Sequence, residues 1–279
     1  MLICRTLAGT VVAGFGGLQC RAGMGEDKAN RQCWLILSVA VLVSLLRMRS
    51  LSDFQIYRQV CEARMPQRFV FWDYSGRLWA AVTRVIPDLK VVAANPAHTE
   101  FASDDLLLVA ETGVIRATAR GTVRHEEFLK KTADFFHIAI DMLEIDVFER
   151  LGYRIIYTQD FPSMKEAAAG FTEFKLLSLP QPSIFGVEEP PEVLGARVTW
   201  ENDDVAFTLD VRTEKRNTEP QIPWEMKDQM NASGTERSLL VVDVDRYTKK
   251  SVSRGQLSIE EWINNSHRNI KKSLSKGLF

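Results

Sequence analysis

The stretch from Glu149 to Phe171 constrains the fold most, because its character changes twice within a short distance. ERLGYRIIYTQDF is typical of a β-strand, Pro162 ends that pattern, and SMKEAAAGF predicts a short helix. A helical pattern precedes this stretch, and strand-rich segments lie on both sides of it. We therefore expect 149–171 to join two parts of the chain.

Two segments predict long helices. From Val123 the apolar residues recur at helical spacing over 128–143. Near the C-terminus, Ser258 and Glu261 form a capping-box pattern in front of a second periodic segment. We expect its inner face to carry Ile259, Trp262, Ile263, Ser266, Ile270 and Leu274.

The remaining segments predict strands and hairpins. Residues 51–65 carry apolar side chains at helical spacing and predict a short helix, whereas 68–85 predict a hairpin around Ser75-Gly76. A second hairpin is expected around Thr112-Gly113, and strict alternation over 205–212 indicates an antiparallel strand. Residues 214–237 are polar and predict an exposed loop.

The order of these segments predicts an α+β fold with a mainly antiparallel sheet. We expect two strand-rich halves, about 48–144 and 145–279, each closed by a long helix. No residue-level repeat relates the halves, so a duplication is suggested by topology alone.

Residues 1–47 differ from the rest. Gly14 and Gly16 begin a phosphate-loop pattern, but Gln19 stands where the third glycine belongs. The apolar run 33–46 is shorter than a membrane-spanning helix. We expect the natural protein to begin at Met48, with 1–47 a mis-called start or a dispensable extension. The alternative is a weak membrane anchor at 33–46.

Composition excludes some function classes. The chain has 35 Lys and Arg against 36 Asp and Glu, so no global field draws nucleic acid or anionic membrane. Cys4, Cys20, Cys33 and Cys61 form neither a CxxC pair nor a disulfide framework. We therefore expect a cytoplasmic protein without a metal or cofactor.

One constellation offers a catalytic alternative. Asp243 and Asp245 alternate on a predicted strand and share a face, and His267 lies on the following helix. Paired carboxylates hold divalent cations or transfer protons, so these three residues suggest a metal-dependent hydrolase. The competing interpretation is structural: the two aspartates end a strand and pair with an arginine.

The segments LGYRII (151–156) and DVDRY (243–247) carry a family resemblance over about 48–279. With a closing helix that contains Trp262 and His267, the chain resembles a sporadically distributed prokaryotic family of uncharacterised proteins. Ile156 and Tyr157 depart from that family's first motif. The resemblance implies a soluble cytoplasmic protein, and it supplies no catalytic residues.

We regard Gly152, Arg154 and Trp262 as the structural signature. Gly152 is expected where the strand bends or admits another backbone closely, and Arg154 is expected to pair with Asp243 or Asp245.

The leading functional hypothesis is a protein-interaction component without catalytic activity. The patchy distribution of the family that the chain resembles implies an accessory or defence-type gene cluster. Its partner is expected to be another protein, and oligomers could form through sheet edges. The alternatives are the hydrolase described above and an interaction domain tethered to a membrane by 33–46.

Overall fold

The structure is a computed structural model, and it describes 2–6, 9–13, 50–67, 70–174, 176, 191–218 and 235–277. The chain divides into two compact units, 1–47 and 48–279. In the first unit, β1 (Leu2–Thr6) pairs antiparallel with β2 (Gly9–Ala13). The glycine pattern at 14–19 and the apolar run 33–46 lie outside the described residues. None of the described helices has the length and apolar composition that crossing a membrane requires.

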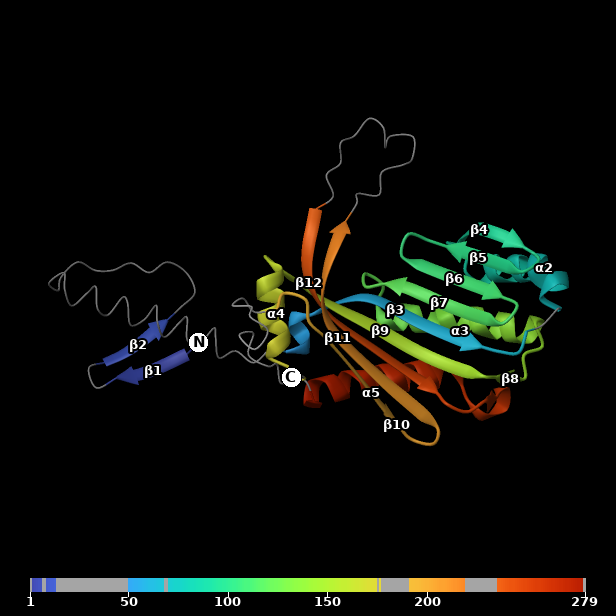
Figure 1. Cartoon of the computed structure of the whole chain (residues 1–279). Coiled ribbons are helices and arrows are strands. Elements are labelled where there is room, and N and C mark those ends of the chain that lie inside the picture. Colours follow the sequence, from blue (N-terminus) through green and yellow to red (C-terminus); the bar gives the residue numbers. More distant parts are fainter. Residues whose placement is uncertain are drawn as a thin grey trace, which may run out of the picture. The chain divides into compact units, whose positions relative to one another are not determined.

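The second unit is built on one nine-stranded sheet in which every neighbouring pair is antiparallel (Figure 1). The strand order is β10-β11-β12-β9-β3-β7-β6-β5-β4. The strands are β3 (Gln55–Arg64), β4 (Lys90–Asn95), β5 (His98–Ala102), β6 (Leu106–Glu111), β7 (Val114–Arg120), β9 (Arg150–Phe161), β10 (Gly195–Glu201), β11 (Val205–Thr218) and β12 (Thr235–Thr248). The predicted α+β fold with a large antiparallel sheet is confirmed.

In the described part of this unit, four α-helices accompany the sheet: α2 (Val70–Val85), α3 (His125–Met142), α4 (Met164–Thr172) and α5 (Ile259–Gly277). The short strands β8 (Val147–Phe148) and β13 (Val252–Ser253) form a separate antiparallel pair. The 3-10 turns η1 (Leu51–Asp53) and η4 (Arg254–Gln256) precede β3 and α5. The joining stretch has the predicted order, because β9 ends at Phe161 and Ser163 caps α4 with its side chain.

The two expected halves form a single sheet. β9 pairs with β3 on one side and with β12 on the other, so the strand of the joining stretch connects the two groups of strands. The helices α3 and α5 also pack against each other. The interpretation of two halves, each closed by its own helix, is therefore not what the structure shows.

Three local predictions were wrong. The expected hairpin over 68–85 is α2, and Phe71, Leu78 and Val82 form its fully buried stripe. The expected helix over 51–65 is mostly β3, in which Gln59, Cys61 and Ala63 alternate inward. The expected loop 214–237 is shorter, because β11 continues to Thr218 and β12 begins at Thr235.

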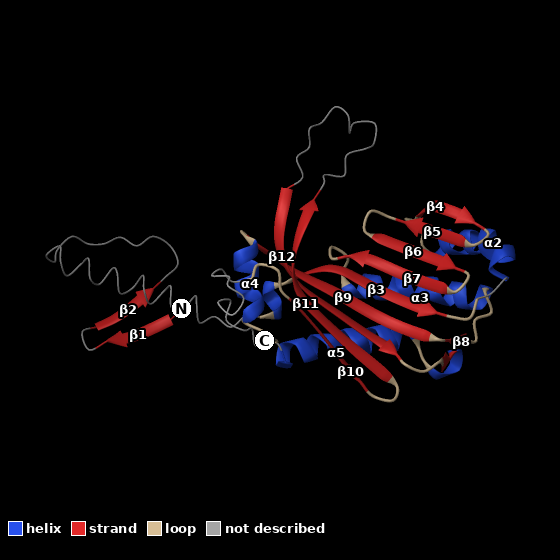
Figure 2. Ribbon diagram, in the orientation of Figure 1, coloured by secondary structure: helices blue, strands red, loops and turns tan. Residues whose placement is uncertain are grey.

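The helices cover one face of the sheet. Figure 2 shows α2, α3 and α5 together behind the strands, and α4 at one end. The inward side chains of β9, including Tyr153 and Ile155, belong to a hydrophobic core that contains the inner faces of α3 and α5. The buried positions expected on the last helix are all confirmed. The opposite face of the sheet is not covered by any of the described helices.

Candidate functional site: the uncovered face of the sheet

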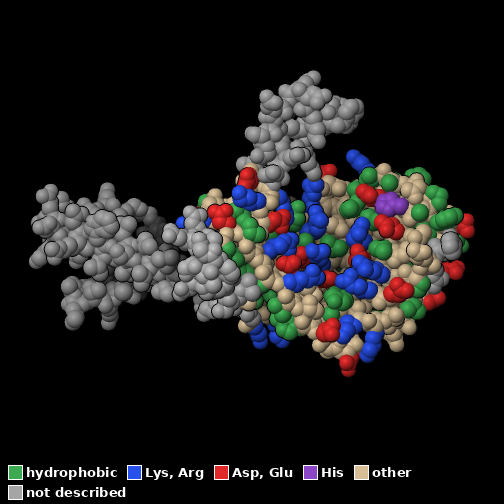
Figure 3. Space-filling view, viewed as in Figure 1, with side chains coloured by type: hydrophobic (Ala, Val, Ile, Leu, Met, Phe, Trp, Pro, Cys, Tyr) green, Lys and Arg blue, Asp and Glu red, His purple; other side chains and the backbone are tan. Residues whose placement is uncertain are grey.

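Alternation along the central strands sends charged side chains to the uncovered face. On β3, β7 and β9 that face carries exposed or partly exposed arginines with two carboxylates, Glu62 and Asp160, and no lysine. The space-filling view shows Lys and Arg side chains gathered over the middle of this face (Figure 3). The arginines are Arg58, Arg64, Arg116, Arg120, Arg150 and Arg154. We call this group the arginine band.

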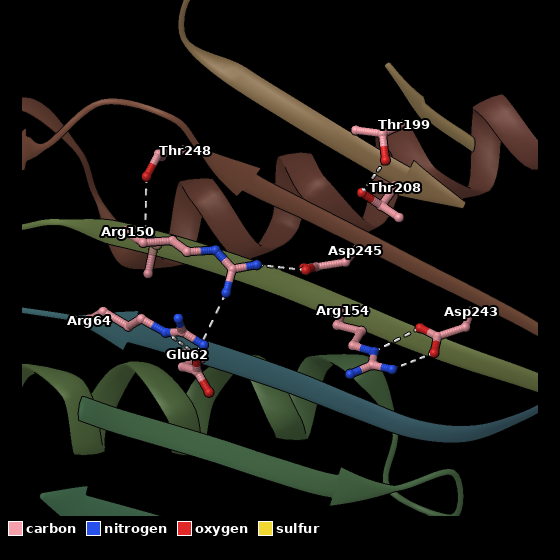
Figure 4. A network of polar contacts seen from close by, with 10 residues as sticks. Glu62, Arg64, Arg150, Arg154, Thr199, Thr208, Asp243, Asp245 and Thr248 are labelled. Atoms are coloured by element: carbon pink, nitrogen blue, oxygen red, sulfur yellow. Dashed lines mark hydrogen bonds and ion pairs between the residues drawn. The ribbon is translucent and has the colours of Figure 1, made fainter. Parts of the chain in front are cut away.

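Asp243 and Asp245 lie beside the band on β12 and hold two of its arginines (Figure 4). Arg154 Nε donates to Asp243 Oδ1 over 2.7 Å, and its Nη2 donates to the second carboxylate oxygen. Arg150 Nη2 donates to Asp245 Oδ2 over 2.7 Å, and its guanidinium lies 4.2 Å from the centre of the Tyr247 ring. The predicted pairing of Arg154 with one of these aspartates is confirmed.

The two aspartates differ in their surroundings. The side chain of Asp243 is only 5% exposed, whereas that of Arg154 is 48% exposed. The hydrogen bonds to Asp243 raise the pKa of the Arg154 guanidinium. Burial raises the pKa of the Asp245 carboxyl, and the facing Arg150 and Arg154 oppose that rise. The pairs fix the arginine side chains in place without using all of their N–H donors.

A shallow hollow of about 120 Å³ lies within the band. Its lining includes Arg64, Arg150, Arg154 and Asp245, and Gly152 contributes to its wall. A Cβ on Gly152 would meet its nearest neighbour, Asp245 Oδ1, at 3.6 Å, which is an ordinary contact. No described backbone approaches Gly152 closely, and the pairing of β9 with β12 is regular there. The expected close approach of another backbone was wrong, because the nearest atoms belong to side chains and the glycine contributes to an open hollow.

His267 lies on the other side of the sheet. Its Nδ1 is 3.0 Å from the hydroxyl of Tyr153, whose side chain points into the helix-covered core, and its ring stacks on His125 at 3.7 Å. Because Asp243 and Asp245 face the uncovered side, the sheet separates them from His267. The three residues of the hydrolase hypothesis are not brought together. Among the described residues there is also no cluster of metal-ligating side chains.

The contacts of the remaining polar and aromatic residues are those of structural side chains. Trp262 is buried in the core, and Arg246 stacks on its ring at 4.3 Å. Ser266 accepts a hydrogen bond from Arg246, and Ser163 caps α4. His137, on α3, is exposed, and its Nε2 lies 2.7 Å from a carboxylate oxygen of Glu260.

Sequence reasoning missed Arg58 and Arg120. The available signal was the recurrence of charge at alternate positions, at 58, 62 and 64 and at 116 and 120, with Val60 and Thr118 as the uncharged members of the two series. That signal was hidden because 51–65 were predicted as a helix. No family model matches the chain, and no curated protein matches it either.

Proposed function

We propose that this protein is a non-catalytic binding protein that recognises another protein through the uncovered face of its sheet. The observation that carries the proposal is the arginine band on three adjacent central strands, on a face that none of the described helices covers. Arginine is enriched in protein interfaces because its planar guanidinium combines stacking with several hydrogen bonds.

The arrangement of the band supports binding more than chemistry. Its carboxylates are engaged with arginines, and His125 and His267 lie on the opposite side of the sheet. His98 lies on the same face as the band, on β5, and its two ring nitrogens contact Glu100 and Glu111. A general acid–base reaction needs a proton donor and acceptor within reach of one substrate. Pre-positioned guanidiniums, by contrast, lose little side-chain entropy when a partner binds, which favours recognition.

The proposal is tested by blocking the face without changing its charge. Thr118 faces outward from β7 between the arginines of the band, and Thr118→Trp adds bulk there. Ala80→Trp, on the exposed side of α2, is the matched control. The wild type and both variants are crosslinked chemically to their neighbours in cells of the native host. We expect the proteins captured by the wild type to be captured by Ala80→Trp and lost with Thr118→Trp. Identical captures with both variants would contradict the proposal.

A further inference from the structure

The arginine band contains two pairs of arginines that lie directly opposite each other on neighbouring strands. Arg58 on β3 faces Arg120 on β7, and Arg64 on β3 faces Arg150 on β9. Like charges directly opposite in an antiparallel pair destabilise the sheet. The fold itself therefore does not explain why arginine occupies both positions of each pair.

The two pairs differ in how their charge is compensated. Arg64 contacts Glu62 at 2.8 Å, and Arg150 contacts Asp245 at 2.7 Å. Arg58 and Arg120 have no carboxylate within ion-pair distance among the described residues, and both are exposed. The guanidinium of Arg58 lies only near the Tyr57 ring, at 5.4 Å. Among the described residues, the Arg58–Arg120 pair is therefore the uncompensated positive charge of the arginine band.

The local backbone fixes the strand positions of this pair. β3 has a bulge between Ile56 and Arg58, and Gly121, which follows Arg120, donates its backbone N–H to the Tyr57 carbonyl oxygen over 3.0 Å. A Cβ on Gly121 would lie 1.4 Å from the Ile56 carbonyl oxygen, so only glycine fits there. The close packing of the bulge against β7 fixes the strand positions that carry the two arginines.

We infer that Arg58 and Arg120 form the docking point for carboxylates of an acidic segment in the partner protein. This inference rests on the proposed function and names the chemistry of the partner. Arginine binds carboxylates through paired, charge-assisted hydrogen bonds, and an incoming carboxylate removes the repulsion between the two guanidiniums.

A nucleic acid carries the same kind of charge but fits this face less well. Glu62, Asp243 and Asp245 lie among the arginines and would repel a continuous phosphate backbone. The Tyr57 ring has the Arg216 guanidinium 4.3 Å from its centre, so it is not free to stack on a base. An acidic protein segment can place separate carboxylates and avoid these positions.

The spacing along β3 sets a requirement on that segment. Arg58 and Arg64 are six positions apart on one strand, which corresponds to about 20 Å. An extended segment that runs along β3 would therefore reach both arginine pairs with carboxylates about six residues apart. Its first contact is expected at Arg58–Arg120, where the charge is uncompensated.

The inference is tested with labelled decaglutamate, whose binding is followed by fluorescence anisotropy at low ionic strength. We expect Arg58→Glu with Arg120→Glu to weaken binding by at least about tenfold. The control, Arg84→Glu with Arg268→Glu, makes the same change in net charge at two exposed helix positions and is expected to bind like the wild type. Far-UV circular dichroism checks that both double variants are folded.

Three results would overturn the inference. The first is that decaglutamate does not bind the wild type. The second is that both double variants lose binding equally, which would indicate a general charge effect. Tighter binding of single-stranded decauridylate that depends on Arg58 and Arg120 would assign the site to nucleic acid instead. After either of the first two results, the crosslinking experiment can still show partners that are lost with Thr118→Trp and kept with Ala80→Trp. In that case the face remains an interaction surface, and only the acidic partner is rejected.

Discussion

The residues that organise the uncovered face are a buried carboxylate and an exposed guanidinium. Asp243 loses most of its water in the folded protein, and Arg154 replaces that water with two hydrogen bonds. Arg212, whose Nη1 lies 3.6 Å from Asp243 Oδ2, is the second cation close to this carboxylate. A charge that is buried in this way is stable only while a partner compensates it.

Arg154→Ala should therefore destabilise the protein by about 1–3 kcal/mol, because the carboxylate of Asp243 is left poorly compensated. Arg120→Ala, which removes an arginine without a described carboxylate partner, should change stability by less than about 0.5 kcal/mol. Chemical denaturation with both variants measures the difference. Equal effects would show that the Arg154–Asp243 contact adds nothing to stability.

A second group of residues forms a polar network under the sheet. Gln59 Nε2 donates to the Val123 carbonyl oxygen over 3.2 Å, which directs Gln59 Oε1 towards Tyr153 and His125. Both must donate to that oxygen, so the Tyr153 hydroxyl accepts from Nδ1 of His267. His125 and His267 then both carry their proton on Nδ1, and His125 Nε2 is buried without a hydrogen-bond partner among the described residues.

The stability of the protein should fall as pH decreases from 6.5 towards 4. Burial, together with His125 and Lys271, lowers the pKa of His267 from 6.5 to about 4, and Glu126 opposes this only weakly. In this interval the unfolded state binds a proton that the folded state does not, so the stabilisation is fully present above pH 6.5 and is lost on acidification.

The measurement is the thermal unfolding midpoint between pH 7 and pH 4.5. His267→Gln keeps an N–H donor for Tyr153 but has no titrating group, so its midpoint should fall less than that of the wild type. Parallel pH profiles for the two proteins would show that His267 does not titrate in the predicted way.

At the scale of elements, two glycines give opposite predictions for the same substitution. Gly121→Ala should destabilise the protein by about 2–4 kcal/mol, because its Cβ would overlap the Ile56 carbonyl oxygen at the junction of β7 and β3. Gly76→Ala, inside α2 with nothing within 4 Å of the new Cβ, should stabilise it by about 0.5–1 kcal/mol. Thermal or urea unfolding of the two variants tests the pair, and a stable Gly121→Ala protein would contradict the described bulge.

The elements with strong periodicity could be predicted from the sequence, and those with mixed signals could not. Helix α3 and helix α5 have long amphipathic repeats, and their positions were confirmed. In α2 the aromatic residues and Ser75-Gly76 suggested a hairpin, but the burial of one helical stripe outweighs these local preferences. In β3 the bulge shifts the alternation after Ile56, so that Phe54 and Cys61 mimic helical spacing.

The candidate site could be predicted only in part. The alternation of Asp243 and Asp245 placed both on one face, and their pairing with arginine followed from the need to compensate charge. Whether His267 lies on the same side of the sheet as the two aspartates depends on the side that α5 covers. That side is set by tertiary packing, and no local sequence pattern indicates it. The arginine band depends on the pairing of β7, β3 and β9, which the sequence analysis had placed in separate halves.

At the scale of the molecule, residues 48–279 should unfold as one cooperative unit. The central strands β3 and β9 are paired along most of their length and connect the two outer groups of strands. In native-state hydrogen exchange, β3 and β9 should be the most protected strands, and the edge strands β4 and β10 should exchange first. Loss of protection in β10–β12 well before β5–β7 would instead indicate two independent halves.

On the uncovered face, binding and stability can make opposite demands on a residue, because a residue that binds a partner need not stabilise the fold. Arg120→Glu replaces an Arg58–Arg120 repulsion with an attractive cross-strand pair. Arg116→Glu, on the same face of the same strand, places two glutamates opposite each other at Glu62. The two substitutions are chemically identical but should have opposite effects on stability.

The most direct test of the account is the free energy of unfolding of Arg120→Glu, with Arg116→Glu as the control. We predict that Arg120→Glu is more stable than the wild type by about 0.2–1 kcal/mol, and that Arg116→Glu is less stable by a similar amount. Such a result would mean that the fold does not require the Arg58–Arg120 pair, as expected of a docking point. A clear loss of stability in Arg120→Glu would show that the pair serves the fold, and it would contradict the central claim.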